Sequence, residues 1–215
     1  MVTAGAFDGE RPLHPAGEKV LLAAFERGWA DPHGSGSASA QSRHLLGAAR
    51  EEIAAHLGAH PSELEFWGEP ALISPVEIQG SPYLPGGKFI AGATERRDIL
   101  ALSERFAHFA SAPVSLTGVI DRDVLLDELE PHATVSIQSA NIETGVRQDL
   151  NDLSALVAPF EAHLHIDFTA SGPLQKLPHY WSTADFPAKS WDGPAGIGVM
   201  AINKEHRWSN PLALS

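Results

Sequence analysis

Residues 189–200 have the sequence Lys-Ser-Trp-Asp-Gly-Pro-Ala-Gly-Ile-Gly-Val-Met, which passes from a polar segment into an apolar one. Three glycines and a proline fall within residues 193–198, and such a cluster is typical of a tight loop. The apolar residues 198–202 predict a short strand. This stretch therefore predicts a glycine-rich loop that enters a strand, and the preceding segments indicate the kind of sheet to which that strand belongs.

Short apolar runs alternate with amphipathic helical patterns along the chain. The sequence predicts helices over residues 15–29, 38–57, 97–110, 121–129 and 150–160, and strands over residues 64–67, 88–91, 114–116, 133–138, 163–168 and 198–202. This alternation is typical of a three-layer α/β fold, in which helices cover both faces of a mostly parallel sheet. No repeat or low-complexity linker interrupts it, so we expect one domain over residues 1–215, with residues 1–15 as an extended N-terminal segment.

Composition narrows the class of protein. The 215 residues are 43% hydrophobic and 20% charged, which is ordinary for a globular protein. A net charge of −12 argues against non-specific binding to nucleic acid or to an anionic membrane. No apolar run is long enough to span a membrane, and no secretory signal pattern opens the chain, so we expect a cytoplasmic protein. The absence of cysteine excludes disulfides, thiolate metal sites and a cysteine nucleophile.

Five short motifs occur in a fixed order. They are Pro-Leu-His-Pro at 12–15, Ala-Ala-Arg-Glu-Glu-Ile-Ala at 48–54 with Leu-Gly-Ala at 57–59, Ser-Ala-Asn-Ile-Glu-Thr-Gly-Val-Arg-Gln at 139–148, His-Leu-His-Ile-Asp at 163–167, and the glycine-rich loop at 191–199. Together they resemble the large domain of cysteine desulfurases and other class V aminotransferases over nearly the whole chain. The resemblance implies the large-domain fold of the fold type I enzymes, which depend on pyridoxal phosphate.

The resemblance places the family's Schiff-base lysine at Ser190. In the family Ser-x-His-Lys-x-x-Gly-Pro is usual, and counting back from Gly193 the lysine position falls on Ser190. Trp191 fits the aromatic residue that often follows the lysine, which supports this register. Serine cannot form the imine, so the resemblance implies a family member without its cofactor lysine.

Other positions correspond to cofactor contacts in the family. The resemblance matches Asp167 to the aspartate that pairs with the pyridinium nitrogen, and Asn141 to the asparagine that hydrogen-bonds the ring hydroxyl. Arg96 stands where a ring-stacking histidine follows a glutamate, and Ala170 stands where a glutamine is usual. Arginine can stack on an aromatic face but cannot act as a general acid or base near neutral pH. Structural alternatives are a buried or capping aspartate, an asparagine bonded to its own turn, and an exposed salt-bridged arginine.

The segment that corresponds to the phosphate loop departs most from the family. Residues 66–74 read Phe-Trp-Gly-Glu-Pro-Ala-Leu-Ile-Ser, where the family has Phe-Thr-Ser-Gly-x-Thr-Glu-Ala-Asn-Asn. Ala71 replaces the threonine hydroxyl, and Pro70 has no N–H to donate. Glu69 would face the phosphate with a like charge, a repulsion of about 4 kcal/mol at ~4 Å and an effective dielectric of ~20. We therefore expect no phosphate binding at this loop.

These departures together predict a homologue that has lost pyridoxal phosphate binding and catalysis, so we expect no cofactor. The family continues for roughly as many residues again, with a catalytic cysteine and a substrate-binding arginine, and we expect that half to be absent after Ser215. Because family members dimerise through the large domain, we expect a dimerising or partner-binding protein. The partner would be a second copy of this chain or an intact paralogue.

Three alternatives stay open. The chain could be an active pyridoxal phosphate enzyme that uses Lys189, or a lysine from a partner chain, although a shift of one residue in an extended loop reverses the side-chain direction. His163, His165 and Asp167 alternate along one face of a predicted strand, and such a set could bind zinc or iron. A serine hydrolase is disfavoured, since no Gly-x-Ser-x-Gly motif occurs.

Overall fold

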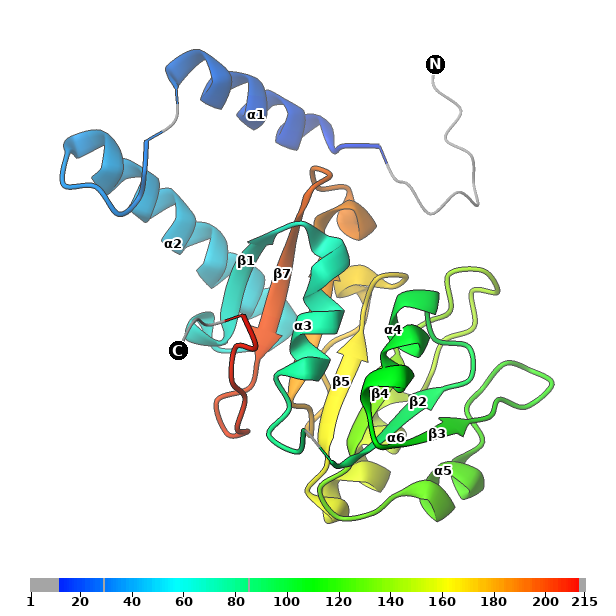
Figure 1. Ribbon diagram of the computed structural model, residues 1–215. Coiled ribbons are helices and arrows are strands. Elements are labelled where there is room, and N and C mark those ends of the chain that lie inside the picture. The colour runs from blue at the N-terminus through cyan, green and yellow to red at the C-terminus, as the bar shows by residue number, and fades with distance from the viewer. Residues whose placement is uncertain (1–11, 29, 85, 213–215) are drawn as a thin grey trace.

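The computed structural model describes residues 12–28, 30–84 and 86–212 (Figure 1). The α-helices are α1 (Pro15–Arg27), α2 (Ser37–Leu57), α3 (Ile73–Gln79), α4 (Arg97–Ala101), α5 (Arg122–Glu128) and α6 (Leu150–Val157). The strands are β1 (Leu64–Gly68), β2 (Lys88–Gly92), β3 (His108–Ala112), β4 (Thr134–Gln138), β5 (His163–Asp167), β6 (Thr183–Pro187) and β7 (Ile197–Ile202). Residues 1–11 of the expected extended segment lie outside the described residues, and residues 12–14 have no regular structure.

All seven strands belong to one sheet, in the order β1-β7-β6-β5-β4-β2-β3. The pairs β2–β3, β2–β4, β4–β5 and β5–β6 are parallel, whereas β7 is antiparallel to both of its neighbours. Consequently β1 to β6 all end at the same edge of the sheet. In open α/β sheets, the loops at the carboxyl ends of parallel strands are where ligands bind. The predicted α/β class with a mostly parallel sheet is confirmed.

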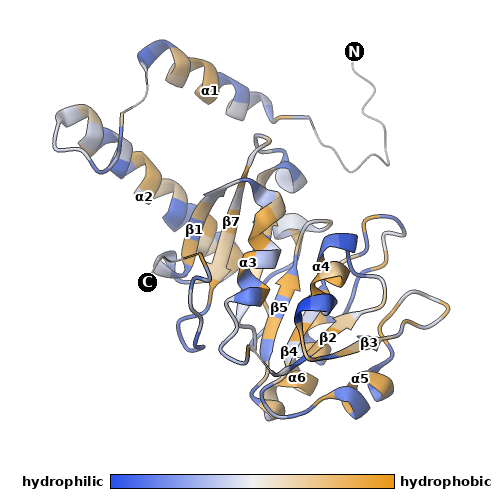
Figure 2. Ribbon diagram, in the orientation of Figure 1, coloured by the Kyte–Doolittle hydropathy of each residue, from blue (hydrophilic) through white to orange (hydrophobic). Residues whose placement is uncertain are grey.

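The two faces of the sheet differ in character. One face carries the large apolar core, which includes Leu164 and Ile166 of β5 and packs against α5, α6 and the end of α2. The opposite face lies under α3 and α4 (Figures 1 and 2). Because side chains alternate along a strand, the odd-numbered residues His163, His165 and Asp167 face this second side. Beneath α3 the sheet therefore carries buried polar groups in place of a second large apolar core.

Helices α1 and α2 extend away from the sheet (Figure 1). Only the last turns of α2 are buried, through Ala54 and Leu57, and Gly58 ends the helix with a φ of 78°, as its position predicted. No described residue of α1 is buried, although the helix carries apolar side chains such as Val20, which is 67% exposed (Figure 2). Within the described residues, no helix is long and apolar enough to cross a membrane.

Two elements of the sequence prediction were wrong between residues 97 and 116. The helix expected over 97–110 ends at Ala101, and after a short 3-10 turn the chain forms β3. The strand expected over 114–116 is a loop that makes only an isolated bridge between Val114 and Ile120. Phe106 stacks on Phe89 of β2 with ring centroids 4.5 Å apart. This contact accompanies the turn out of the helix, and the next residues pair with β2 as an edge strand.

Two elements were not predicted at all. Helix α3 has β-branched residues and Pro75, and it is buried on most sides, so it shows no amphipathic pattern. Strand β6 contains Asp185 and ends at Pro187, and all five of its residues are buried, so it shows no alternation. Both elements contribute directly to the polar cluster described below.

Candidate functional site

Two aspartates lie side by side on two neighbouring central strands. Asp167 is the last residue of β5 and is the register partner of Asp185 on β6. Their exposed fractions are 2% and 0%. Burial, followed by the charge of Asp167, raises the pKa of Asp185 well above its ordinary value. Two adjacent carboxylates out of water are costly unless a cation or a proton balances them.

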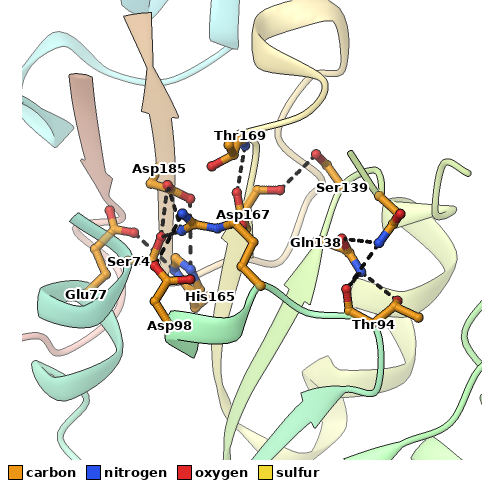
Figure 3. A network of polar contacts seen from close by, with 12 residues as sticks. Ser74, Glu77, Thr94, Asp98, Gln138, Ser139, His165, Asp167, Thr169 and Asp185 are labelled. Carbon is orange, nitrogen blue, oxygen red and sulfur yellow. Dashed lines mark hydrogen bonds and ion pairs between the residues drawn. The ribbon is translucent and has the colours of Figure 1, made fainter. Parts of the chain in front are cut away.

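Arg96 supplies the cation, from the position just before α4. Its Nε lies 2.6 Å from Asp167 Oδ2 and its Nη2 lies 3.9 Å from Asp185 Oδ2. Nη2 also donates to Ser74 Oγ at 2.7 Å, and Ser74 Oγ donates in turn to Asp185 Oδ2 at 2.9 Å (Figure 3). Burial lowers the pKa of the guanidinium, but Asp167, Asp185 and Asp98 outweigh burial and raise it, so Arg96 stays charged.

Both carboxylate oxygens of Asp167 are therefore satisfied within the chain. Oδ1 accepts the backbone N–H of Thr169 at 2.6 Å, and Oδ2 accepts from Arg96 (Figure 3). The backbone oxygen of Asp167 accepts from the amide and hydroxyl of Ser139 at 2.8 and 2.9 Å. The arginine is salt-bridged, as one sequence alternative held, but its side chain is only 24% exposed and points into the site.

A second cluster of polar side chains lies on the same face of the sheet, around His165 of β5. His165 Nδ1 lies 3.1 Å from Glu77 Oε2, and His165 Nε2 lies 4.0 Å from Asp185 Oδ1 (Figure 3). All three side chains are fully buried. Burial lowers the pKa of His165 to about 3, so its imidazole is neutral. Burial, then Asp185 and Asp167, raises the pKa of Glu77 well above its ordinary value.

The predicted metal set and the observed cluster share only His165. Nitrogen and oxygen atoms of Glu77, His165 and Asp185 lie within 4.8 Å of one another, and they are the only three such residues that converge in the described part of the chain. Nε2 of His163 lies 3.2 Å from Thr183 Oγ1 instead. Sequence reasoning missed Glu77 and Asp185 because α3 and β6 were not predicted.

Glu95 is a further buried acid beside this site. It is 5% exposed, and neither of its carboxylate oxygens has a hydrogen-bond partner. Burial, followed by the charge of Asp167, raises the pKa of Glu95 well above its ordinary value, and Arg96 opposes that rise. No sequence signal separated this glutamate from an ordinary surface residue.

Asn141 organises its own loop. Its Oδ1 accepts the backbone N–H groups of Glu143 and Thr144 at 3.0 and 2.8 Å, and Gly145 turns the chain with a φ of 72°. Its Nδ2 donates to the backbone oxygen of Thr94 at 3.2 Å. These contacts match the structural alternative, in which the side chain bonds to its own turn.

Ser190 and Lys189 lie on a 3-10 turn, η6 (Ala188–Trp191), directly after β6. Ser190 Oγ donates to the backbone oxygen of Pro187 at 2.7 Å. Ser190 also packs closely on Gly172, where an added Cβ would lie 3.0 Å from Ser190 O and Oγ. The side chain of Lys189 is exposed, and Ala170 lies in the half-buried turn after β5.

The loop after β1 uses its backbone donors internally. The N–H of Glu69 donates to the oxygen of Gly196 at 3.2 Å, and the N–H of Leu72 donates to the oxygen of Glu69 at 3.1 Å. The N–H of Ile73 donates to the oxygen of Pro70, which itself has no N–H. Glu69 also has a positive φ of 67°. The glycine-rich loop thus holds this segment in place through Gly196.

The sheet is seven-stranded and mostly parallel, and a buried aspartate ends its central strand. These features are typical of α/β proteins that bind a ligand at the carboxyl edge of the sheet. Within that class, the aminotransferase class-V family model matches residues 23–213, and the chain belongs to this family. The family implies pyridoxal phosphate as cofactor.

Relatives and solved structures agree with this assignment. The chain is 24% identical to the mitochondrial cysteine desulfurase of Drosophila melanogaster, over 91% of this chain and 45% of that protein. It is also 24% identical to an IscS-like cysteine desulfurase of Mycobacterium tuberculosis, over 90% of this chain and 53% of the relative. The chain therefore spans about half the length of these relatives.

Two solved structures share the fold. A NifS-like protein superposes with a TM-score of 0.82 at 22% identity, covering 97% of this chain and 61% of that one. A structure described as SspA in complex with cysteine superposes with a TM-score of 0.87 at 19% identity, covering 96% of this chain and 64% of that one.

Proposed function

We propose that this chain is a cysteine desulfurase-like protein that does not bind pyridoxal phosphate and acts by associating with another protein chain. The observation that carries the proposal is the 2.6 Å contact between Arg96 Nε and Asp167 Oδ2. The resemblance implies that this aspartate would pair with the protonated ring nitrogen of the cofactor. Here the guanidinium of Arg96 already provides the positive charge that pairs with Asp167. This planar group is held by hydrogen bonds to fixed partners.

The residues present do not fit the cofactor at three separate points. Asp167 has both oxygens occupied by groups of the chain. Ser190 stands in the lysine position and its hydroxyl is bonded to Pro187. At the loop after β1, the N–H groups of Glu69 and Leu72 are used within the chain, and a carboxylate and a proline occupy the segment that would face a phosphate. We therefore derive no reaction step through pyridoxal phosphate.

An absorbance titration tests this proposal. The wild-type chain and a Ser190→Lys variant are titrated with pyridoxal phosphate and monitored at the Schiff-base band. Because Arg96 and the altered phosphate loop remain in the variant, we expect no saturable band from either protein. A saturable band from the Ser190→Lys variant alone would mean that the wild type fails to bind pyridoxal phosphate only because it lacks the lysine amine. A band from the wild type would overturn the proposal.

An active enzyme that uses Lys189 is the second candidate, favoured only by the place of Lys189 next to the lysine position on η6. Its side chain is exposed whereas Asp167 is buried, so an imine at Lys189 would require η6 to rearrange. Borohydride reduction followed by peptide mapping would find an adduct on Lys189 if this candidate is right. A lysine from a partner chain would give a band only in a mixture with that partner.

Association is supported by the exposed apolar surface of α1 and α2. Val20, Leu22 and Leu45 are 67%, 58% and 61% exposed, and Val20 and Leu45 line one groove between the two helices. Clustered apolar side chains of this kind are typical of interaction sites. The partner proposed is a second copy of this chain, and a heterodimer with an intact paralogue is the alternative outcome of the same measurement. Light scattering after size-exclusion chromatography distinguishes a dimer from a monomer.

A further inference from the structure

The geometry points to a divalent metal site formed by Glu77, His165 and Asp185 beneath the Asp167–Arg96 pair. The three residues come from α3, β5 and β6, so they bring together one helix and two strands of the sheet. One imidazole and two carboxylates form a donor set that suits zinc, iron or manganese. Asp185 also belongs to the Arg96 network, but none of the three residues is one of the cofactor positions that the family resemblance implies, and the site does not depend on the proposed function.

The spacing of the donor atoms fits one ion. One ligand atom from each of the three residues lies within 4.8 Å of the other two. His165 Nδ1 lies 3.1 Å from Glu77 Oε2, and the other ring nitrogen, Nε2, lies 4.0 Å from Asp185 Oδ1. An imidazole binds one ion through one nitrogen, and an ion bound at ~2.0–2.2 Å from each ligand has ligands that are roughly 3–4 Å apart. Binding therefore requires a carboxylate to move toward the ring nitrogen that binds the ion. Figure 3 shows Glu77, His165 and Asp185 turned toward one another from their separate elements.

The cluster contains buried polar atoms that the chain leaves unsatisfied. Both carboxylate oxygens of Glu77, Oδ1 of Asp185 and Nε2 of His165 make no well-aligned hydrogen bond, and all three residues are 0% exposed. The nearest contact is between Glu77 Oε2 and His165 Nδ1, at 3.1 Å. Buried polar atoms without partners are uncommon and destabilising. Because one ligand atom from each of the three residues lies within 4.8 Å of the other two, a single bound ion would satisfy them together.

The charges also favour a cation. Arg96 is the nearest cation that the structure pairs with this cluster, at 3.9 Å from Asp185, and its shorter bond is to Asp167. Glu77 makes no ion pair with a lysine or arginine in the described part of the chain. A divalent ion would balance both carboxylates at once. Ser136, the register partner of His165, places another buried, unpartnered hydroxyl on the same face of the sheet.

The burial of the site defines the role of the ion. A buried site is typical of structural metals, which usually have four ligands, whereas catalytic sites keep a position open to water or substrate. The three residues here supply three ligands, so an enclosed water would complete the shell. Glu77 lies on α3, which packs on β5, β6 and β7. The ion would therefore hold α3 onto the sheet, and its binding would raise the stability of the fold.

Metal uptake by the full chain tests the proposal. The purified protein is treated with a chelator, exchanged into metal-free buffer and titrated with Zn²⁺, Mn²⁺ or Co²⁺. Bound metal is measured by elemental analysis, Co²⁺ coordination by visible absorbance, and stability by thermal unfolding. Glu77→Gln and Asp185→Asn each remove one ligand. Glu95→Gln is the matched control, because Glu95 is an equally buried glutamate with two unpartnered oxygens outside the cluster.

We expect the wild type and Glu95→Gln to bind one ion per chain and to gain thermal stability from it. Loss of an outer-shell partner alone costs roughly 10–100-fold in metal affinity, so each ligand variant should lose at least that much. Binding by Glu77→Gln and Asp185→Asn as tight as in the wild type would overturn the proposal. A wild-type chain that takes up no stoichiometric ion would also overturn the proposal. That result would mean that protons, and not a metal ion, balance the negative charges of the cluster. If a ligand variant does not fold, the wild-type stoichiometry and Co²⁺ spectrum decide.

Discussion

Arg96 Nε lies 2.6 Å from Asp167 Oδ2, and the same guanidinium reaches Asp185 through Ser74. One arginine thus holds two buried aspartates on neighbouring parallel strands. In the family such an aspartate is implied to hold a cofactor, and here Asp167 forms an internal ion pair with Arg96. The stability of this edge of the sheet should depend on that one side chain.

Replacement of Arg96 by alanine should therefore lower the free energy of unfolding. Removing one partner of a buried ion pair leaves an uncompensated charge, at a cost of about 3 kcal/mol. Arg96→Lys should recover only part of the loss, because lysine lacks the planar fork that spans Asp167 and Ser74. Urea denaturation at pH 7 measures the effect. Arg97→Ala, at the exposed next position, is the control, and equal stability of the two alanine variants would contradict the account.

Glu95 should make the protein less stable as the pH rises. Its folded pKa lies well above the ordinary value of 4.5, so above that pH the unfolded chain releases a proton that the folded chain retains. Stability that is present below pH 4.5 is therefore lost as the pH rises. Glu95→Gln should raise the free energy of unfolding at pH 7.5 and change it little at pH 4.5. Urea titrations at the two pH values, with chelator present, test this; a pH-independent gain would refute it.

His163 should have the opposite effect. Burial, helped by His165 and His206, lowers its folded pKa from 6.5 to about 3. Between these values the unfolded chain binds a proton that the folded chain does not, so stability present above pH 6.5 is lost as the pH falls toward 3. The loss is about 1.4 kcal/mol per pH unit. His163→Gln should reduce the slope by this amount between pH 6 and 4.5, whereas exposed His44→Gln should leave it unchanged. Identical slopes for His163→Gln and wild type would be the contrary result.

The groove between α1 and α2 should control association. Val20→Asp with Leu45→Asp places two charges on an apolar surface that a partner would bury, so the proposed dimer should become a monomer. Leu116→Asp, which changes a fully exposed loop residue, should leave the dimer intact. Light scattering gives the mass of each species. A wild-type chain that is already monomeric, and that forms no complex with an intact paralogue, would count against association.

The sequence predicted the parts of the site that follow a regular pattern. The period-two strand at residues 163–167 predicted that His163, His165 and Asp167 share one face, and the fold confirms it. Gly58 and Gly145 of the quoted motifs lie at turns and both have a positive φ, which glycine adopts readily. Such features depend on local backbone preferences, which single residues reveal.

The remaining site residues could not be predicted because tertiary contacts place them. Glu77 and Asp185 lie in α3 and β6, which are buried nearly all round and therefore lack the periodic pattern that marks an element. The sequence matched Arg96 to a family position, but its inward direction results from two buried acids, Asp167 and Asp185, on separate strands. Charge pairing between distant segments leaves no local signature in one sequence.

The central claim is that Arg96 and its partners leave no place for pyridoxal phosphate. The most direct measurement is peptide mapping by mass spectrometry after the full chain is incubated with stoichiometric pyridoxal phosphate and reduced with borohydride. The account predicts no adduct above the background level on the exposed Lys19. A stoichiometric adduct at Lys189 would contradict it.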